Sequence, residues 1–335
     1  MQQAPLSFNT VVGALGAAGE ETRLRLLALL SEAELTVSDL VTILGQSQPR
    51  ISRHLKLLAE AGLVVRHREG SWAFFLAAPG GAAGEIARAV AGWLDPQDPI
   101  LVSDRARLGE VRRARDAQAA RYFAAQAPNW DKIRALHVPE ERVETALREI
   151  VGTEPVRALL DLGTGTGRML ELLAPLAERG VGIDQSPAML AVARARLERA
   201  GLRNVQLRQG DIYAVPVERN GYDLVVLHQV LHYLDDPGRA LREAARVLRP
   251  GGRLLVVDFA PHAEESLRES HAHRRLGFGP DEIASYLGDA ALDLSDHREL
   301  PPLAGEGGKL TVSLWLARDR RIQADPLPLM HREVA

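Results

Sequence analysis

Glycines and an acidic residue follow a short apolar run in the second half of the chain. The run VRALLDLGTGTG (156–167) lacks alternation, which is typical of a strand buried on both faces, and it ends in a glycine loop. Asp161 supplies an acceptor suited to a positively charged amine, while the glycines let backbone N–H groups approach a ligand closely. The candidate ligand contacts of this loop are Asp161, Gly163, Thr164, Gly165 and Gly167.

Two further acidic residues end the next two predicted strands. Asp184 ends GVGID (180–184), where both carboxylate oxygens can hold ribose hydroxyls. Asp211 ends VQLRQGD (205–211), where it can accept a hydrogen bond from the exocyclic amine of adenine. Gln185 and Ile212 follow these residues and are included as contacts. Amine, ribose and adenine together indicate S-adenosylmethionine or S-adenosylhomocysteine, although a nicotinamide-binding fold is the alternative for such a loop.

Two histidines follow the next predicted strand, YDLVVL (222–227), and are the only candidates for catalysis. His228 is also a candidate cofactor contact, and His228 or His232 could act as a base near neutral pH. Their spacing of four would also suit a metal pair, but a packed or capping role is the commoner fate of such residues. No metal is expected, and the catalytic residues stay open.

The elements that position these residues alternate between strand and helix. Strands are predicted at 156–162, 180–184, 205–211, 222–227 and 253–259, and helices start near 168 and cover 187–200 and 237–248. This alternation predicts a doubly wound α/β fold with a parallel sheet, in which ligands bind at the carboxyl ends of the strands. Before it, residues 103–127 form a helix dense in arginine, interpreted as a solvated face. Tyr122, Trp130 and Arg134 are expected either to lie over the ligand or merely to pack. Residues 260–278, which contain His262, His271 and His273, are expected to form a helix that covers the pocket.

The first hundred residues predict a different kind of domain. Helical periodicity covers residues 8–30 as one interrupted helix or two, and 36–44 as another, which Gly45 closes. The next helix buries Ile51, Leu55 and Leu58 and leaves a polar face exposed. A hairpin follows, turning at residues 69–71. Five basic and two acidic residues lie between 46 and 70, a local positive charge suited to phosphate contact.

The pattern QPRISRHLKLLAEAGLV (48–64) and the hairpin after it resemble the winged-helix repressors of the ArsR family. The alternative is an amphipathic helix packed for structure only. The resemblance implies a homodimer on double-stranded operator DNA, joined through residues 10–30 and 82–94. Many members of that family sense metals through cysteine pairs or Asp/His clusters, but this chain has no cysteine and no histidine between His67 and His137, so metal sensing at the usual family sites is not expected. The candidate DNA contacts are Gln46, Ser47, Gln48, Arg50, Arg53, His54, Lys56, Arg66 and Arg68.

The later motifs, including GIDQSPAML, QGDIYAVP and HQVLHYLDDPGRALREAARVLRPGG, resemble UbiE-like class I S-adenosylmethionine-dependent methyltransferases, which have a Rossmann-like fold. The combination is similar to ArsR-type repressors that respond to S-adenosylhomocysteine. We therefore expect a winged-helix domain (1–95), a helical connector and lid (96–150), a methyltransferase-like domain (151–318) and a flexible tail (319–335). We expect the methyltransferase-like domain to sense its ligand and thereby to change the binding of operator DNA. The alternatives are an active methyltransferase and a structural protein whose nucleoside site is vestigial.

Composition also limits how DNA would be bound, where the protein is located and which chemistry it can perform. The net charge of -3 gives no global attraction to nucleic acid, so DNA binding depends on the local patch. No apolar stretch is long enough to span a membrane and no basic segment precedes an apolar core at the N-terminus, so a cytoplasmic location is expected. The absence of cysteine excludes thiol-dependent chemistry such as arsenite methylation.

Overall fold

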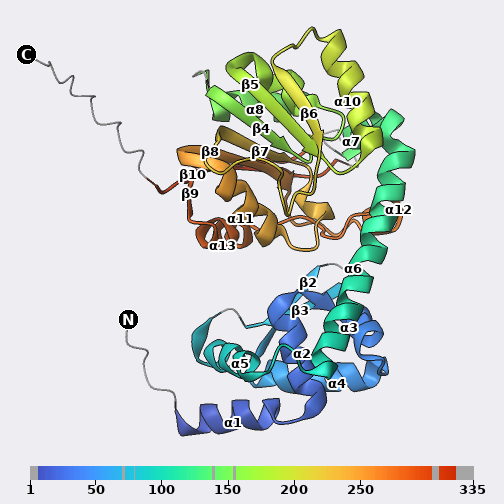
Figure 1. The fold of residues 1–335 in the computed structure, drawn as a ribbon, viewed down its shortest axis with the longest axis vertical. Helices are drawn as coiled ribbons and strands as arrows, with labels where there is room; N and C mark the ends of the chain where they lie inside the picture. The colour runs from blue at the N-terminus through green and yellow to red at the C-terminus, as the bar shows by residue number, and fades with distance from the viewer. Residues whose placement is uncertain are drawn as a thin grey trace, which may run out of the picture. The chain divides into compact units, whose positions relative to one another are not determined.

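The computed structural model describes residues 7–69, 72–78, 80–137, 140–153, 156–303 and 309–321. These residues form two compact units (Figure 1). The N-terminal unit extends to Tyr122 and also contains residues 233–236 and 261–276, whereas the C-terminal unit contains residues 123–232, 237–260 and those from 277 onward. The N-terminal unit therefore includes two segments that are distant from it in the sequence.

Helices dominate the N-terminal unit. Its elements are α1 (Phe8–Ala18), α2 (Glu21–Glu32), β1 (Leu35–Thr36), α3 (Val37–Leu44), α4 (Gln48–Glu60), β2 (Val64–Glu69), β3 (Trp72–Ala77), α5 (Gly81–Trp93), most of α6 (Pro99–Gln126) and α12 (Ser266–Ser270). The three strands pair in the order β1-β3-β2, with β3 antiparallel to both neighbours. The predicted helix-turn-helix and the predicted hairpin of two strands are thus confirmed. The predicted turn of the hairpin includes Gly70 and Ser71, which lie outside the described residues.

Local sequence explains where the helices of this unit begin and end. Thr36 and Asp39 form a reciprocal capping box at the start of α3, which satisfies two backbone N–H groups. Gly45 ends α3 in the left-handed conformation, with φ 66°, which costs glycine little. Pro49 lies in the first turn of α4, where its missing N–H breaks no hydrogen bond. The apolar side chains of α4 then face the core.

The C-terminal unit is built on one sheet of seven strands. Its order is β6-β5-β4-β7-β8-β10-β9; β4 to β8 are parallel, and β10 is antiparallel to β8 and β9. The strands are β4 (Val156–Leu162), β5 (Ala177–Asp184), β6 (Val205–Gln209), β7 (Tyr222–His228), β8 (Leu248–Phe259), β9 (Leu292–Leu300) and β10 (Val312–Asp319). The doubly wound α/β prediction is confirmed: the chain adds β5 and β6 on one side of β4 and then β7 and β8 on the other, so the strand order reverses between β4 and β7.

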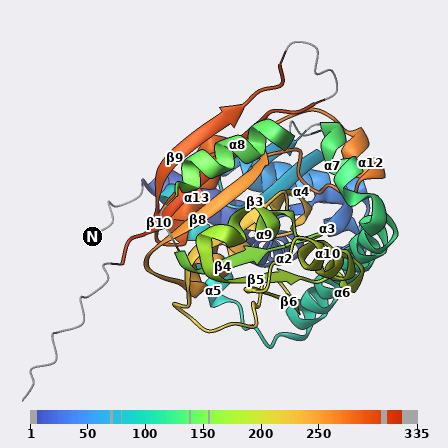
Figure 2. The ribbon, with the colours of Figure 1, turned by 90° about the horizontal axis from the view of Figure 1, so that it is seen from above.

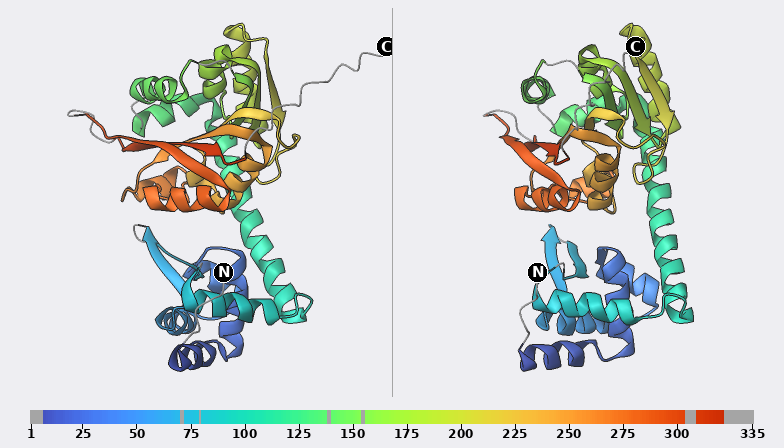
Figure 3. Two further views of the ribbon diagram at one scale, coloured as in Figure 1. Left: turned by 90° about the vertical axis from the view of Figure 1, so that its left-hand side faces the viewer. Right: turned by 60° about the vertical axis from the view of Figure 1, so that its left-hand side comes forward.

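Helices cover both faces of this sheet (Figures 1 and 3). The α-helices are α7 (Trp130–His137), α8 (Glu140–Val151), α9 (Arg168–Leu173), α10 (Pro187–Arg199), α11 (Pro237–Val247) and α13 (Pro280–Asp289). The short 3-10 turns are η1 (Ala127–Asn129), η2 (Ala174–Leu176) and η3 (Leu231–Tyr233). Helix α8 lies across one face (Figure 2), and α11 and α13 lie on the opposite face.

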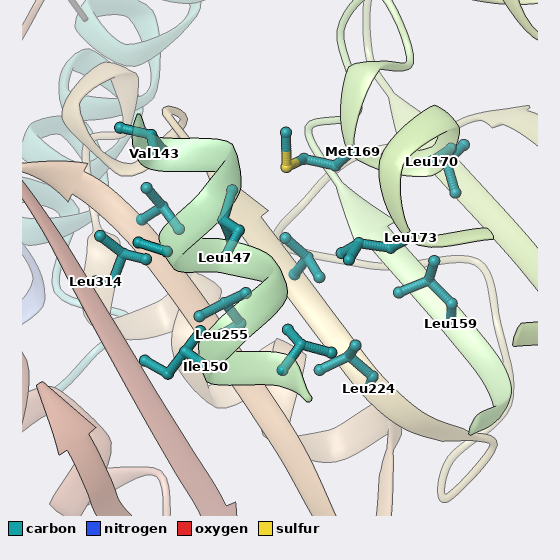
Figure 4. Close-up of a cluster of buried hydrophobic side chains, with 14 of the residues drawn as sticks. Val143, Leu147, Ile150, Leu159, Met169, Leu170, Leu173, Leu224, Leu255 and Leu314 are labelled. Carbon is teal, nitrogen blue, oxygen red and sulfur yellow. The ribbon is translucent and has the colours of Figure 1, made fainter. Parts of the chain in front are cut away.

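The core of this unit lies between α8, α9 and the sheet. Val143, Leu147 and Ile150 of α8 project toward Leu255 and Leu314 of the strands (Figure 4). Alternate residues of the parallel strands fill the other face, so the strands are apolar on both sides. Burial on both faces explains why they appear in the sequence as continuous apolar runs.

Two expectations fail at the end of the chain and after β8. A helix is expected over residues 260–278, but only the five residues of α12 are helical there, and His271 and His273 lie after it. Asp319 ends β10, and Arg321 binds its carboxylate with a separation of 2.6 Å, so residues 319–321 belong to the fold. The rest of the predicted tail, residues 322–335, lies outside the described residues.

Candidate functional site

The predicted ligand residues line up along one edge of the sheet. Because β6, β5, β4 and β7 are parallel neighbours, their carboxyl ends meet at that edge. Asp211 follows β6, Asp184 ends β5, Asp161 is the penultimate residue of β4 and His228 ends β7. The sheet order therefore places Asp211, Asp184 and Asp161 in the same succession that adenine, ribose and amino acid have in an adenosyl compound, with His228 beyond Asp161.

Asp161 is the most deeply buried of the four. It is 1% exposed and accepts a hydrogen bond of 2.5 Å from the hydroxyl of Thr164. The pKa of Asp161 is raised to about 7, chiefly by burial; the hydrogen bond from Thr164 and the charge of Arg134 lower it, whereas the charge of Asp184 raises it. A buried carboxylate that ionises with difficulty is a strong acceptor for an incoming ammonium group.

Asp184 is held rigidly by two backbone groups. Its Oδ2 accepts a hydrogen bond from Gly165 N and its Oδ1 accepts one from Ser186 N, both at 2.8 Å. Burial raises the Asp184 pKa, and these two backbone donors oppose that effect. Each oxygen retains acceptor capacity, so the carboxylate can receive two vicinal hydroxyls in a fixed plane.

The glycine loop lies close to its neighbours. Gly163 has φ 71°, and a Cβ there would meet Val230 Cγ2 at 2.5 Å. Gly165 has φ 51°, and a Cβ there would lie 3.7 Å from the indole nitrogen of Trp130. Both positions thus require glycine, for backbone conformation and at Gly163 also for space. Gly167 immediately precedes α9.

The remaining predicted contacts lie at the same edge with more exposure. Asp211 is exposed, and its Oδ1 accepts a 2.8 Å hydrogen bond from Tyr213 N. Gln185 is exposed and its carbonyl accepts a 3.2 Å hydrogen bond from Gln209, while Ile212 is half-buried. The structure brings all ten predicted residues to one edge of the sheet. Their roles as ligand contacts stay predictions.

Helix α7 contributes residues that lie near this loop. Asp131 accepts a 2.9 Å hydrogen bond from the Thr166 hydroxyl and also binds Arg196, which fixes the start of α7. The Arg134 side chain is 10% exposed and binds Glu140 at 2.7 Å. Its charge acts on both Asp161 and His228. Trp130 and Arg134 therefore lie at the site, as one of the two interpretations proposed, whereas Tyr122 binds His271 in the N-terminal unit.

The two histidines after β7 have different surroundings. Burial lowers the pKa of His228 well below its usual value, and Arg134 lowers it further. His232 is 1% exposed, and its Nδ1 lies 2.6 Å from Oδ1 of the fully buried Asp258. Sequence reasoning missed Asp258; an acidic residue inside the apolar strand RLLVVDF was its signal. A buried aspartate fixes the tautomer of a histidine and leaves Nε2 as the acceptor.

In the N-terminal unit, most predicted DNA contacts are exposed. The exposed ones are Ser47, Gln48, Arg50, Arg53 and Lys56 at and along α4, and Arg66 and Arg68 on β2. The exposed residues of α4 lie on the opposite side of the helix from Ile51, Leu55 and Leu58, which are buried. These exposed side chains are therefore polar and mostly basic, which is what a DNA-binding surface needs to contact phosphates and base edges.

Two of the nine predicted contacts lie against the protein instead. Gln46 is half-buried, and its amide donates to the Thr22 hydroxyl at 3.3 Å. His54 is half-buried with Nδ1 3.5 Å from Glu20, and burial lowers its pKa although Glu20 opposes this. These two side chains hold α4 and the turn before it against the start of α2, and their roles as DNA contacts stay predictions.

Helix α6 holds α3 and α2 through the arginines predicted to be a solvated face. Arg107 donates to the carbonyl of Ile43 at 3.0 Å, and Arg115 binds Asp39. Arg105 binds Glu32 at 2.5 Å. Arg107 satisfies a carbonyl in the last turn of α3 and Arg115 binds the capping aspartate in its first turn. The solvated-face interpretation is wrong for Arg115, whose side chain is 23% exposed, whereas Arg107 is exposed as expected and Arg105 remains 37% exposed.

Comparisons with known proteins agree with this division. Residues 20–65 match the family "Bacterial regulatory protein, arsR family", and residues 160–256 match the family "Methyltransferase domain". The chain therefore joins an ArsR-family helix-turn-helix domain to a class I methyltransferase domain. Among the described residues, no cluster of histidine and acidic side chains could hold a metal ion, and no helix is long and apolar enough to cross a membrane.

Individual relatives cover the second domain. A demethylmenaquinone methyltransferase from Thermus thermophilus is 43% identical over 144 residues, which is 42% of this chain and 64% of that protein. An uncharacterized methyltransferase from Bacillus subtilis, YcgJ, is 33% identical over 104 residues, 31% of this chain and 41% of that protein. The crystal structure of the N-methyltransferase NodS from Bradyrhizobium japonicum with S-adenosyl-L-homocysteine has 23% identity and a TM-score of 0.44, covering 54% of this chain and 87% of that one.

The chain spans only part of these relatives: it covers 33% to 64% of the length of the first curated proteins that it resembles. The methyltransferase relatives include a UbiE protein from Shewanella, 35% identical over 125 residues, 36% of this chain and 50% of that protein. The second domain is therefore similar to UbiE-like methyltransferases over part of their length, and the match to the arsR family precedes it in the chain.

The raised pKa of Asp161 predicts a pH-dependent affinity for an ammonium-bearing ligand. Below about pH 7 the carboxyl is protonated in the free protein, so binding must remove that proton. We expect the affinity for S-adenosylhomocysteine to fall roughly five- to tenfold between pH 7.5 and pH 6. Calorimetry at both pH values measures this; an unchanged affinity would show that the ligand amine does not bind ionised Asp161.

Proposed function

We propose that the chain is a cytoplasmic transcription regulator that binds operator DNA as a homodimer and senses S-adenosylmethionine or S-adenosylhomocysteine through its methyltransferase domain. The observation that carries the sensing role is Asp161, a buried carboxylate with a raised pKa beside the glycine loop. With Asp184 and Asp211 on the neighbouring strand ends, it offers acceptors for amine, ribose and adenine but no cradle for phosphate.

The DNA-binding role is supported by the exposed basic face of α4 and β2. The chain is acidic overall, so a duplex would be held only at this face. A coupling free energy of about 1–3 kcal/mol between the two sites would change operator affinity by 5- to 150-fold. This range is within reach of a ligand that binds the two forms of the dimer unequally.

The experiment first selects a duplex from a random-sequence pool with the full-length chain and then titrates it with and without each nucleoside. A shift of operator affinity of at least about fivefold supports the sensor. Adenosine serves as the control because it lacks the amino acid that Asp161 would bind. If nucleoside binds by calorimetry and operator affinity does not move, the sensing role is wrong.

A second candidate function is methyl transfer to a small acceptor, and the His232–Asp258 pair favours it. The 2.6 Å contact would orient His232 to remove a proton from an acceptor. Under this alternative the N-terminal domain is regulatory. Labelled product from S-adenosylmethionine and a metabolite extract, lost in Asp161→Ala, would support the enzyme; labelled product that survives this change would point to a contaminant.

The homodimer is supported by an apolar stripe on α1. Phe8, Val12 and Leu15 are 80%, 52% and 43% exposed and lie one or two turns apart on one side of the helix. Phe8→Ser with Val12→Ser is expected to weaken self-association at least about tenfold, because it removes apolar surface from the interface. Sedimentation velocity measures the change, and Leu57→Ser, a single apolar loss at 38% exposure on α4, is the control. Equal association of all three proteins would place the interface elsewhere.

A further inference from the structure

One face of the hairpin formed by β2 and β3 is covered by arginines from residues 261–276. This hairpin face consists of His67, Trp72 and Phe74, whose rings stack with centroids 5.4 Å and 6.0 Å apart. Arg268 lies 4.9 Å from the Trp72 ring and 5.8 Å from the Phe74 ring, and Arg275 lies 4.9 Å from the Phe74 ring. Both arginine side chains are only 3% exposed.

Buried guanidinium groups need partners, and the hairpin region supplies one. Glu34 binds Arg275, and the Glu34 carboxylate also lies 2.8 Å from Nδ1 of His67. Nη1 of Arg275 lies 3.3 Å from Nε2 of His67. A guanidinium can only donate, so Nε2 accepts and Nδ1–H donates to Glu34. Glu34, Arg275 and His67 thus satisfy one another's hydrogen-bonding groups, so the contact is a connected polar network.

Residues 261–276, called the excursion below, form a loop that starts just after β8 and whose two ends lie side by side. It leaves after Phe259 and returns before Phe278, where Phe278 N donates to the Phe259 carbonyl at 2.9 Å. Gly277 closes the base with φ 87°, and a Cβ there would meet the Ala260 carbonyl oxygen at 2.1 Å. The two ends of this segment are therefore held together by a backbone hydrogen bond, so residues 261–276 form a defined loop of the structure.

The covering segment also carries a carboxylate close to the hairpin face. The Glu265 carboxylate is 33% exposed and lies 3.6 Å from Arg268, which itself lies 4.9 Å from the Trp72 ring. The same hairpin carries Arg66 and Arg68, two of the proposed DNA contacts. The docked segment consequently adds a negative charge beside an element that must approach phosphates, which costs DNA affinity.

We propose that residues 261–276 form an autoinhibitory element, which docks through Arg268 and Arg275 on the hairpin face and must leave it for tight DNA binding. This inference rests on the DNA-binding part of the proposed function, but it does not depend on the identity of the nucleoside. It also explains why a hairpin expected to contact DNA carries two stacked aromatic rings, Trp72 and Phe74, on a face away from the core.

The test compares full-length wild type with Arg268→Ala/Arg275→Ala on a duplex selected by the wild type from a random-sequence pool. Loss of two positive charges ordinarily weakens DNA binding, whereas release of the element should tighten it about three- to tenfold. Arg121→Ala is the matched control, since it removes an exposed charge from α6 without touching the hairpin. Trp72→Ala removes the opposite side of the contact without a charge change and should also tighten binding.

Amide hydrogen exchange provides the second measurement and needs no DNA. Exchange in residues 64–69 and 72–77 should rise several-fold in the double variant and in Trp72→Ala, and not in Arg121→Ala. Unchanged exchange would show that the element does not dock, and raised exchange with weaker DNA binding would show that it braces the hairpin; either result overturns the proposal. If wild type selects no duplex, the DNA-binding function fails, and exchange alone then decides whether docking occurs.

Discussion

Asp161→Asn is expected to bind S-adenosylhomocysteine about 100-fold more weakly than the wild type, a loss of roughly 3 kcal/mol. The substitution preserves the shape of the side chain and an acceptor for the Thr164 hydroxyl, which lies 2.5 Å away in the wild type. It removes the negative charge that the ligand ammonium would meet in a site with little solvent. Isothermal calorimetry at pH 7.5 measures the change.

Two controls separate this effect from damage to the fold. 5′-Methylthioadenosine carries adenine and ribose but no ammonium, so its affinity should be nearly the same in both proteins. Because burial raises the Asp161 pKa, the ionised carboxylate destabilises the free protein at high pH. Asp161→Asn should therefore raise the melting temperature at pH 8, and this gain should shrink as pH falls toward 4. An equal loss of both ligands would assign Asp161 to structure.

The ligand edge could be predicted from the sequence because it depends on strand ends alone. Asp161 and Asp184 follow apolar runs and Asp211 follows an alternating strand, and parallel strands bring their carboxyl ends together whatever the details of packing. The glycine loop is equally local, since positive φ at Gly163 and Gly165 is a property of the chain itself. The antiparallel β10 leaves no comparable motif and was not foreseen.

Side chains whose partners are distant in the sequence could not be predicted. Helical periodicity separates buried from polar positions on α4 but does not show that His54 lies beside Glu20, thirty-four residues earlier. The same holds for Arg115, whose partner Asp39 belongs to another helix. An arginine-rich helix looks solvated until the carboxylates and carbonyls that face it are known.

The excursion after β8 shows a further limit. Its histidines and arginines occur at spacings that suggest a helix, yet the chain is helical only over Ser266–Ser270. Ala272 has φ 58°, which ends any helix there, and Arg275 is held by Glu34 and His67. Tertiary contacts thus override local periodicity in this segment, and the burial of its arginines cannot be deduced from composition.

Arg53→Ala and Arg50→Ala are each expected to cost about 1–3 kcal/mol of discrimination between the selected duplex and random DNA, or roughly 5- to 150-fold. Both side chains are exposed on α4, the helix that would enter the major groove, and a forked guanidinium reads two acceptors of a guanine at once. Competition binding of the selected duplex against random duplex measures the discrimination.

Lys56→Ala is the matched comparison on the same helix. Lys56 is exposed, and its ammonium lies 3.8 Å from Glu60, a weak surface pair that leaves it able to meet phosphate. A phosphate contact carries no sequence information, so this variant should weaken all duplexes alike and reduce the slope of log affinity against log salt by about one. His54→Ala should change discrimination little, because His54 lies half-buried beside Glu20. Equal losses on both duplexes for Arg50, Arg53 and Lys56 would mean that α4 contacts the backbone and that sequence is recognised elsewhere.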